Sequence, residues 1–88
     1  MPSVVIYTTA HCGYCRSAKA FLAKRGVAFR EVDVTGDDAA RAALLERSGG
    51  QRTVPQIFVG DVHVGGYSDL VALDAAGKFS PLLDSPKA

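Results

Sequence analysis

The sequence predicts an α/β fold with a four-stranded mixed sheet and helices on both faces. Short β-branched runs alternate with segments of helical apolar spacing in the first half of the chain, and two further strand-like runs follow in close succession. The 88 residues are 48% hydrophobic and 22% charged, a balance that fits one compact domain. We therefore expect a single domain over residues 1–88, with a frayed tail from about Asp84.

The first half of the chain has the pattern of a strand–helix–strand unit. Val4–Thr8 is an apolar, β-branched run, which is typical of a strand covered on both faces. Apolar residues then recur at spacings of three and four until Gly26, which is typical of a helix end. Residues 27–34 are expected to form a second strand, and a right-handed crossover places it beside the first strand in parallel.

The second half of the chain supplies one more helix, a hairpin and a helical C-terminal segment. Acidic residues near the start of the next helix favour the positive end of its dipole, and paired glycines stop it. This order of elements predicts a thioredoxin-like fold. The expected elements are a helix opened by residues 35–38 and stopped at 49–50, strands over 56–59 and 62–64 joined by the turn Gly60-Asp61, a helix from Tyr67 or Ser68 to Gly77, and a short helix holding Phe79, Leu82 and Leu83.

The charge of the chain is balanced. Ten basic and nine acidic residues give a formal net charge of +1, and the sequence contains no block of like charge. Nucleic-acid binding needs basic clustering, so the sequence argues against it. The first apolar run is too short for a membrane span or for the core of an export signal. We therefore expect a cytoplasmic protein without membrane association, in which two cysteines do not serve as a structural disulfide.

The two cysteines lie where the first strand gives way to the first helix. Cys12, at the helix N-terminus, faces unpaired backbone N–H groups and the positive end of the dipole, and both favour the attacking thiolate. Cys15 follows about one helical turn later on the inward face, so the two sulfurs can lie close enough to bond. We interpret Cys12 as the exposed attacking thiol and Cys15 as the buried resolving thiol.

Two other interpretations of the cysteine pair remain open. Two unrelated buried cysteines would need no chemistry at all. Alternatively, the two cysteines could form half of a structural zinc site. Such a site needs four ligands, and only His11 and His63 remain as the other two; both histidines are otherwise expected to be solvated. A Cys-x-x-Cys beside a βαβ pattern is a specific redox signal, and it favours the redox interpretation.

The chain resembles the glutaredoxins, in particular the dithiol type of bacterial glutaredoxin 3, from Val4 to about Leu83. The resemblance implies glutathione-dependent reduction of protein–glutathione mixed disulfides and of protein disulfides, with glutathione as the reductant. We expect a monomer whose partners are glutathione and glutathionylated or disulfide-containing proteins. Three separated motifs carry the resemblance in the family's order: Cys12-Gly13-Tyr14-Cys15, Thr53-Val54-Pro55 and Gly65-Gly66-Tyr67-Ser68-Asp69.

The resemblance also implies a glutathione site. It implies a cis Val54-Pro55 bond packed beside Cys12, with the Val54 backbone turned outward to pair with an extended peptide. A helix N-terminus suits the γ-glutamyl carboxylate, and an arginine suits the glycyl carboxylate. The implied binding residues are Gly66, Ser68 and Asp69 at the γ-glutamyl end, Arg52 and Thr53 near the glycyl end, and Tyr14, Val54, Pro55 and Tyr67 along the groove.

One departure from the family pattern concerns a cation. Many glutaredoxins carry a lysine shortly before the first cysteine, where this chain has Thr-Ala-His at residues 9–11. Arg16 and Arg52 are the candidates to replace that positive charge. Stabilisation of the thiolate is therefore expected to rest mainly on the helix N-terminus.

A second departure keeps a rival function open. Gly13 stands where many dithiol glutaredoxins have proline, and the resemblance then implies a [2Fe–2S] cluster ligated by Cys12 from each of two chains and by two glutathiones. No other metal is expected. A redoxin served by thioredoxin reductase is a third hypothesis, which the presence of the motif at residues 65–69 disfavours.

Overall fold

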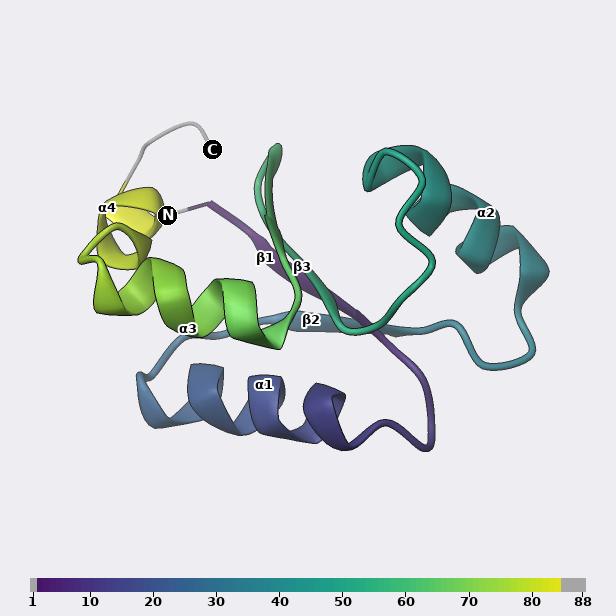
Figure 1. The fold of residues 1–88 in the computed structure, drawn as a ribbon, viewed down its shortest axis with the longest axis horizontal. Coiled ribbons are helices and arrows are strands. Elements are labelled where there is room, and N and C mark those ends of the chain that lie inside the picture. The colour runs from purple at the N-terminus through teal and green to yellow at the C-terminus, as the bar shows by residue number, and fades with distance from the viewer. Residues whose placement is uncertain (1, 85–88) are drawn as a thin grey trace.

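The computed structural model describes residues 2–84 and has four strands in one sheet, flanked by helices (Figure 1). The strand order is β2-β1-β3-β4, with β1 parallel to β2 and antiparallel to β3, and β4 antiparallel to β3. This is the predicted thioredoxin-like α/β fold. In chain order the elements are β1 (Val4–Thr8), α1 (Gly13–Lys24), β2 (Arg30–Asp33), α2 (Asp38–Arg47), β3 (Gln56–Val59), β4 (Val62–Gly65), α3 (Tyr67–Ala75) and α4 (Phe79–Asp84).

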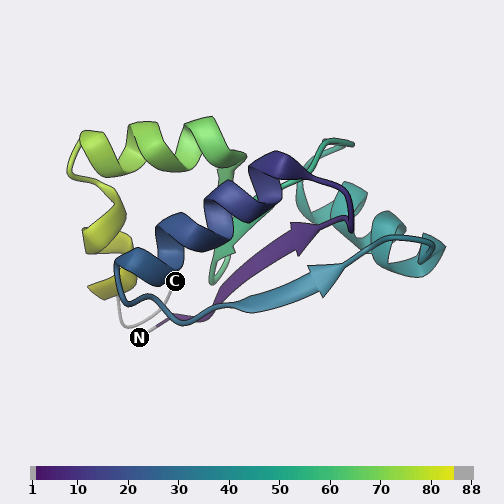
Figure 2. The ribbon, with the colours of Figure 1, turned by 90° about the horizontal axis from the view of Figure 1, so that it is seen from below.

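Helices cover both faces of the sheet, as expected, because successive side chains of the central strands point to opposite sides. On one face Ile6 and Ile57 belong to an apolar cluster shared with α1, α3 and α4. On the other face Tyr7 and Phe58 pack with Leu44 of α2. Figure 2 shows α1 and α3 together on one side of the strands, with α2 set apart from them.

The second strand is shorter than the sequence predicts, so the expectation for residues 27–34 is wrong at its beginning. The Val27 N–H donates to the Leu22 carbonyl at 3.0 Å, which uses residue 27 to close α1 instead of to start a strand. β2 therefore begins at Arg30. At its far end the Val34 N–H still donates to the Thr8 carbonyl at 2.9 Å before the chain leaves the sheet.

The remaining predicted elements are confirmed. Asp37 caps α2 by accepting from the Ala40 N–H at 2.9 Å, which explains why the helix starts there. Gly60 and Asp61 separate β3 from β4, as expected of a hairpin turn. The expected tail begins at Asp84, the last residue of α4, and otherwise lies outside the described residues. None of the helices within residues 2–84 has the length and apolar character needed to cross a membrane.

The register of the sheet brings distant parts of the chain to one edge. Tyr7, near the end of β1, pairs with Gln56 at the start of β3. Ile57 in turn pairs with Gly65 at the end of β4. The start of α1, the loop before β3 and the start of α3 consequently meet at the same end of the sheet (Figure 1).

Candidate active site

Cys12 and Cys15 occupy the first turn of α1. Cys12 is the N-cap residue, with extended backbone angles (φ −121°, ψ 109°), and its sulfur accepts a hydrogen bond from the Cys15 backbone N–H at 3.1 Å. A sulfur in this position receives one of the helix's unpaired N–H groups. Cys12 is partly exposed, whereas the Cys15 side chain is only 1% exposed. The structure therefore gives the two thiols different access to a substrate.

The surroundings of Cys15 keep its thiol neutral. Burial, and after it the hydrogen bond with Cys12, raises the pKa of Cys15 from 9.0 to about 11. At neutral pH Cys15 is consequently protonated and is a poor nucleophile until its proton is removed. The chemistry of the pair thus begins at the accessible sulfur.

The second motif lies directly against the first. The bond between Val54 and Pro55 is cis, as the resemblance implies, and Pro55 is buried. The Cys12 thiol lies 3.7 Å from the Val54 carbonyl oxygen and donates to it. This contact fixes the backbone of Val54 beside the sulfur at which exchange would occur.

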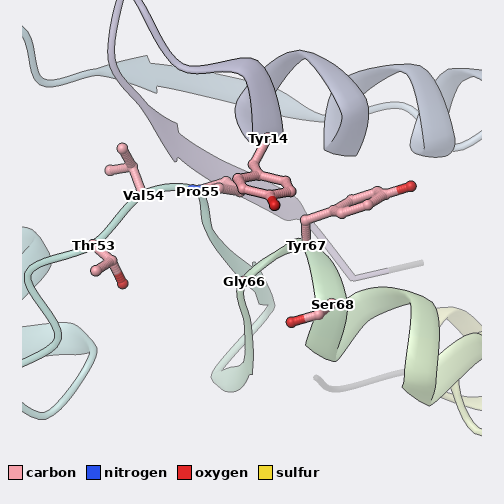
Figure 3. Close-up of a pocket in the computed structure, with 7 residues that line it drawn as sticks. All are labelled: Tyr14, Thr53, Val54, Pro55, Gly66, Tyr67 and Ser68. Atoms are coloured by element: carbon pink, nitrogen blue, oxygen red, sulfur yellow. The ribbon is translucent and has the colours of Figure 1, made fainter.

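A groove of about 320 Å³ opens beside this contact (Figure 3). Tyr14 lies on one side of the groove and is 69% exposed, and its ring stacks on Tyr67 with centroids 6.1 Å apart. The groove is polar and apolar in similar measure, which suits a small peptide better than a purely apolar ligand. All three motifs contribute to its lining, which consists of Tyr14, Thr53, Val54, Pro55, Gly66, Tyr67 and Ser68.

The third motif forms the N-terminus of α3. Gly66 is the N-cap residue, and its backbone N–H donates to the Asp69 carboxylate at 2.9 Å. Gly65 adopts φ +115°, and a Cβ atom there would lie 2.5 Å from the Asp69 Oδ2 atom, so only glycine fits. Gly66 also comes close to Pro55, because a Cβ atom on it would lie 3.5 Å from the Pro55 carbonyl oxygen. The two glycines thereby bring the helix N-terminus to the groove.

A second hollow, of about 380 Å³, adjoins the groove and is more polar. Asp69 faces this hollow and does not line the groove itself. Thr53, Gly66 and Ser68 line both spaces, which makes them one continuous surface. A ligand that extends along the groove past Ser68 would therefore reach the carboxylate of Asp69.

Comparison with known proteins decides the family. Residues 4–64 match the family model described as Glutaredoxin. The chain belongs to the glutaredoxin family. It is 52% identical over 85 residues to a glutaredoxin of Pseudomonas aeruginosa, covering 97% of this chain and 100% of that one. It is also 49% identical to glutaredoxin 3 of Escherichia coli K12, covering 94% and 99% of the two chains.

Solved structures give the same result. A solution structure of glutaredoxin from Brucella melitensis matches with a TM-score of 0.84 at 49% identity, covering 100% of this chain and 95% of that one. A crystal structure of a buckwheat glutaredoxin–glutathione complex matches with a TM-score of 0.83 at 33% identity, covering 93% of this chain and 76% of that one. The chain is thus a thiol–disulfide oxidoreductase of the glutathione-dependent family, with a dithiol Cys-x-x-Cys site.

The structure does not bring every candidate residue of this glutaredoxin into the groove. Arg52 instead lines a hollow of about 140 Å³ against α2, together with Arg41 and Gln51. Arg16 lies nearer to the cysteines, because its Nη2 atom is 3.9 Å from where a Cβ atom on Gly13 would be. Of the two candidates to replace the upstream lysine, Arg16 is therefore the one beside the active-site turn.

Sequence reasoning missed two residues that adjoin the groove, Gln56 and His63. His63 is exposed, as expected, yet its Nε2 atom lies 2.6 Å from Oε1 of the buried Gln56. A polar residue among the buried positions of β3 is the signal that was available. Residues 2–84 contain no group of three or more His, Cys, Asp or Glu side chains that could hold a metal ion.

Proposed function

We propose that this glutaredoxin reduces protein–glutathione mixed disulfides and protein disulfides, and that the groove beside Cys12 holds the glutathione moiety. The convergence of the three motifs on one groove carries the proposal. The partly exposed Cys12 thiolate attacks the glutathione sulfur, and the client's thiol leaves and takes up a proton. Cys12 then carries glutathione as a mixed disulfide.

Two routes release glutathione from Cys12, and only the first of them returns Cys12 directly to its thiol form. A second glutathione attacks the mixed disulfide and releases glutathione disulfide. Alternatively the Cys15 thiolate attacks Cys12, glutathione leaves as a thiol, and the Cys12–Cys15 disulfide closes. The same closure reduces a protein disulfide. Cys12 first attacks one client sulfur and forms a mixed disulfide, and Cys15 then displaces the client's thiol as the Cys12–Cys15 disulfide closes. Glutathione afterwards reduces that disulfide back to the dithiol.

The backbone of Val54 suits the cysteinyl part of glutathione. In the reduced protein its carbonyl accepts from the Cys12 thiol. Once Cys12 is in a mixed disulfide, that hydrogen is gone and the carbonyl is free to accept from the cysteinyl N–H of the bound tripeptide. The same reaction that loads the sulfur thus prepares the neighbouring acceptor.

The N-terminus of α3 suits the γ-glutamyl end of glutathione. Backbone N–H groups and the helix dipole favour a carboxylate there, with the Ser68 hydroxyl on the groove wall. The Asp69 carboxylate lies in the adjoining hollow, within the same surface, and is able to accept from the ammonium group.

We propose that this protein works as a monomer in the cytoplasm, where reduced glutathione is abundant enough to serve as its electron donor.

A comparison of electron donors tests the proposed function. We expect turnover of a small glutathione mixed disulfide when glutathione, glutathione reductase and NADPH are supplied. We expect no comparable turnover when thioredoxin reductase and NADPH replace them. Equal or faster turnover with thioredoxin reductase would contradict the glutathione site.

The pKa of Cys15 leads to a prediction about pH. Burial is the main reason that the pKa of Cys15 is raised to about 11, and this cause persists when Cys12 carries glutathione. Below its pKa, the thiolate fraction of Cys15 grows with pH. We therefore expect its displacement of glutathione from Cys12 to accelerate about tenfold per unit between about pH 6 and pH 9. Acid quenching followed by mass spectrometry measures this rate, and a plateau below about pH 9 would contradict the assignment.

Cluster binding is a second candidate function, and the space around Cys12 favours it. Apart from its two neighbours in the chain, a Cβ atom on Gly13 would contact only the end of the Arg16 side chain, so there is open space next to Gly13. One such thiolate from each of two chains, with two glutathione thiolates, would complete the ligands of a [2Fe–2S] cluster. An absorption spectrum and the elution volume of protein purified without oxygen and with glutathione test this role. A colourless monomer would contradict it.

A further inference from the structure

Gln56 is a buried amide whose hydrogen-bonding groups are all engaged near the groove. Its side chain is 3% exposed. Its Nε2 atom donates to the Thr53 carbonyl oxygen at 3.1 Å and to the Thr53 hydroxyl oxygen at 3.2 Å. The two contacts tie the side chain of Gln56, on the sheet, to the loop residue that lines the groove. The carbonyl oxygen of a buried amide needs a hydrogen-bond partner as well, because an unpaired buried polar atom is unfavourable.

That partner is His63 on β4. Because Gln56 donates to Thr53 through its nitrogen, its Oε1 atom accepts, and the His63 Nε2 atom at 2.6 Å is the donor. The imidazole ring stacks on Phe58 with centroids 4.7 Å apart, and Phe58 lies beneath the Arg47 guanidinium. The ring is thereby oriented with Nε2 toward Gln56. Both the neutral tautomer that this bond selects and the imidazolium carry a hydrogen on Nε2, so either form supports Gln56.

The chain of bonds determines what the Thr53 hydroxyl offers to the groove. The Thr53 Oγ1 atom accepts from Gln56, so the hydroxyl keeps its own hydrogen to donate. Figure 3 shows the hydroxyl groups of Thr53 and Ser68 pointing from opposite sides into the space between them. A hydroxyl fixed as a donor favours an oxygen acceptor, such as a carboxylate or a peptide carbonyl.

We propose that Gln56 and His63 are positioning residues, which hold the Thr53 hydroxyl as a hydrogen-bond donor to an oxygen atom of bound glutathione. They do not touch the tripeptide's sulfur, and they act on binding rather than on the exchange of disulfides. The inference rests on the glutathione site proposed above. We call the chain of hydrogen bonds from His63 on β4 through Gln56 to Thr53 the relay. The relay determines that the Thr53 hydroxyl binds a hydrogen-bond acceptor.

A double-mutant cycle on glutathione binding tests the relay. The probe is S-methylglutathione, which cannot exchange with Cys12, titrated into the reduced protein and followed by NMR. We expect Thr53→Val and Gln56→Met each to weaken binding about fivefold, the equivalent of about 1 kcal/mol for one lost hydrogen bond. Because Gln56 acts through Thr53, the double variant should bind no more than about twofold more weakly than Thr53→Val alone.

Conservative variants and an independent readout accompany the cycle. Thr53→Ser keeps the hydroxyl and should bind as the wild type does. His63→Phe keeps the stacking on Phe58 and removes the donor at an exposed position, so it should weaken binding about twofold to threefold even if Gln56→Met fails to fold. The rate of Cys12 alkylation by iodoacetamide should be unchanged in each variant, since the relay leaves the sulfur alone.

The outcomes separate this inference from the proposed function. Two results would overturn the relay and leave the glutathione site in place, provided that the wild type binds the probe. In the first, the effects of Thr53→Val and Gln56→Met on affinity multiply in the double variant. In the second, Gln56→Met binds as tightly as the wild type. Failure of the wild type to bind S-methylglutathione would overturn both. Non-additive losses with rescue by Thr53→Ser would support the relay.

Discussion

Replacing Cys12 with serine is expected to reduce turnover of a small glutathione mixed disulfide at least about a thousandfold, because a serine hydroxyl does not displace a thiol from a disulfide. Cys12 is the partly exposed thiol beside the groove residue Val54, and its sulfur accepts from the Cys15 backbone N–H in the first turn of α1. No other described thiol can replace it within residues 2–84, since Cys15 is buried and its pKa is raised to about 11. The coupled assay with glutathione reductase measures the effect directly.

Cys15→Ser is the matched control for this prediction. It removes the buried thiol but leaves the attacking sulfur and the groove in place, so turnover with the small mixed disulfide should stay within about threefold of wild type. Reduction of a protein disulfide, which needs both thiols, should be lost in the same variant. Substantial activity of Cys12→Ser with either substrate would show that the nucleophile is assigned to the wrong residue.

Gly65→Ala is expected to damage both the fold and the binding of glutathione. The residue has φ +115°, and the added Cβ atom would lie 2.5 Å from the Asp69 carboxylate. The carboxylate must then move away from the Gly66 N–H that it caps. Backbone strain of about 1–3 kcal/mol and the lost cap of about 1 kcal/mol together lower the free energy of unfolding by about 3 kcal/mol.

Gly77→Ala is the matched control, because it introduces backbone strain without disturbing the cap of α3. Gly77 also has a positive φ, +73°, but no heavy atom lies within 4 Å of its Cβ position. It should lose only about 1–2 kcal/mol from backbone strain and keep wild-type affinity for S-methylglutathione. Urea unfolding and the NMR titration measure the two quantities. If Gly65→Ala and Gly77→Ala lowered the free energy of unfolding and the affinity equally, the role given to Gly65 would be contradicted.

The general fold and the ends of most elements followed from local chemistry. The run 35–38 predicted the start of α2, and Asp37 within it proves to be the cap, because a carboxylate caps a helix through contacts within three residues of itself. The start of β2 did not follow, because Val27 has a strand-like side chain yet serves to close α1. A residue with high strand propensity is excluded from a strand when its backbone N–H bonds to the end of the preceding helix. Side-chain propensity does not predict that bond.

The site was predictable in its chemistry and less so in its geometry. The spacing of Cys12 and Cys15 beside a βαβ pattern indicated a redox pair, and the resemblance to a family indicated the cis bond before Pro55. Arg52, which was expected near the glycyl end of glutathione, lies beside α2 and does not line the groove. The contact of Gln56 with His63 joins two strands, because His63 pairs with Phe58 and Gln56 lies two residues from Phe58 along β3, and no local pattern encodes it.

The stacked tyrosines at the groove give the protein an optical property. The chain has no tryptophan and only three tyrosines. Two of the three, Tyr14 and Tyr67, stack on each other at the groove wall, while Tyr7 is buried on the opposite face of the sheet beneath α2. Tyrosine emission, free of the energy transfer to indole that masks it in most proteins, therefore comes largely from the groove. A ligand in the groove would change the surroundings of two of the three tyrosines, so the glutathione binding proposed above is expected to change this emission without a label.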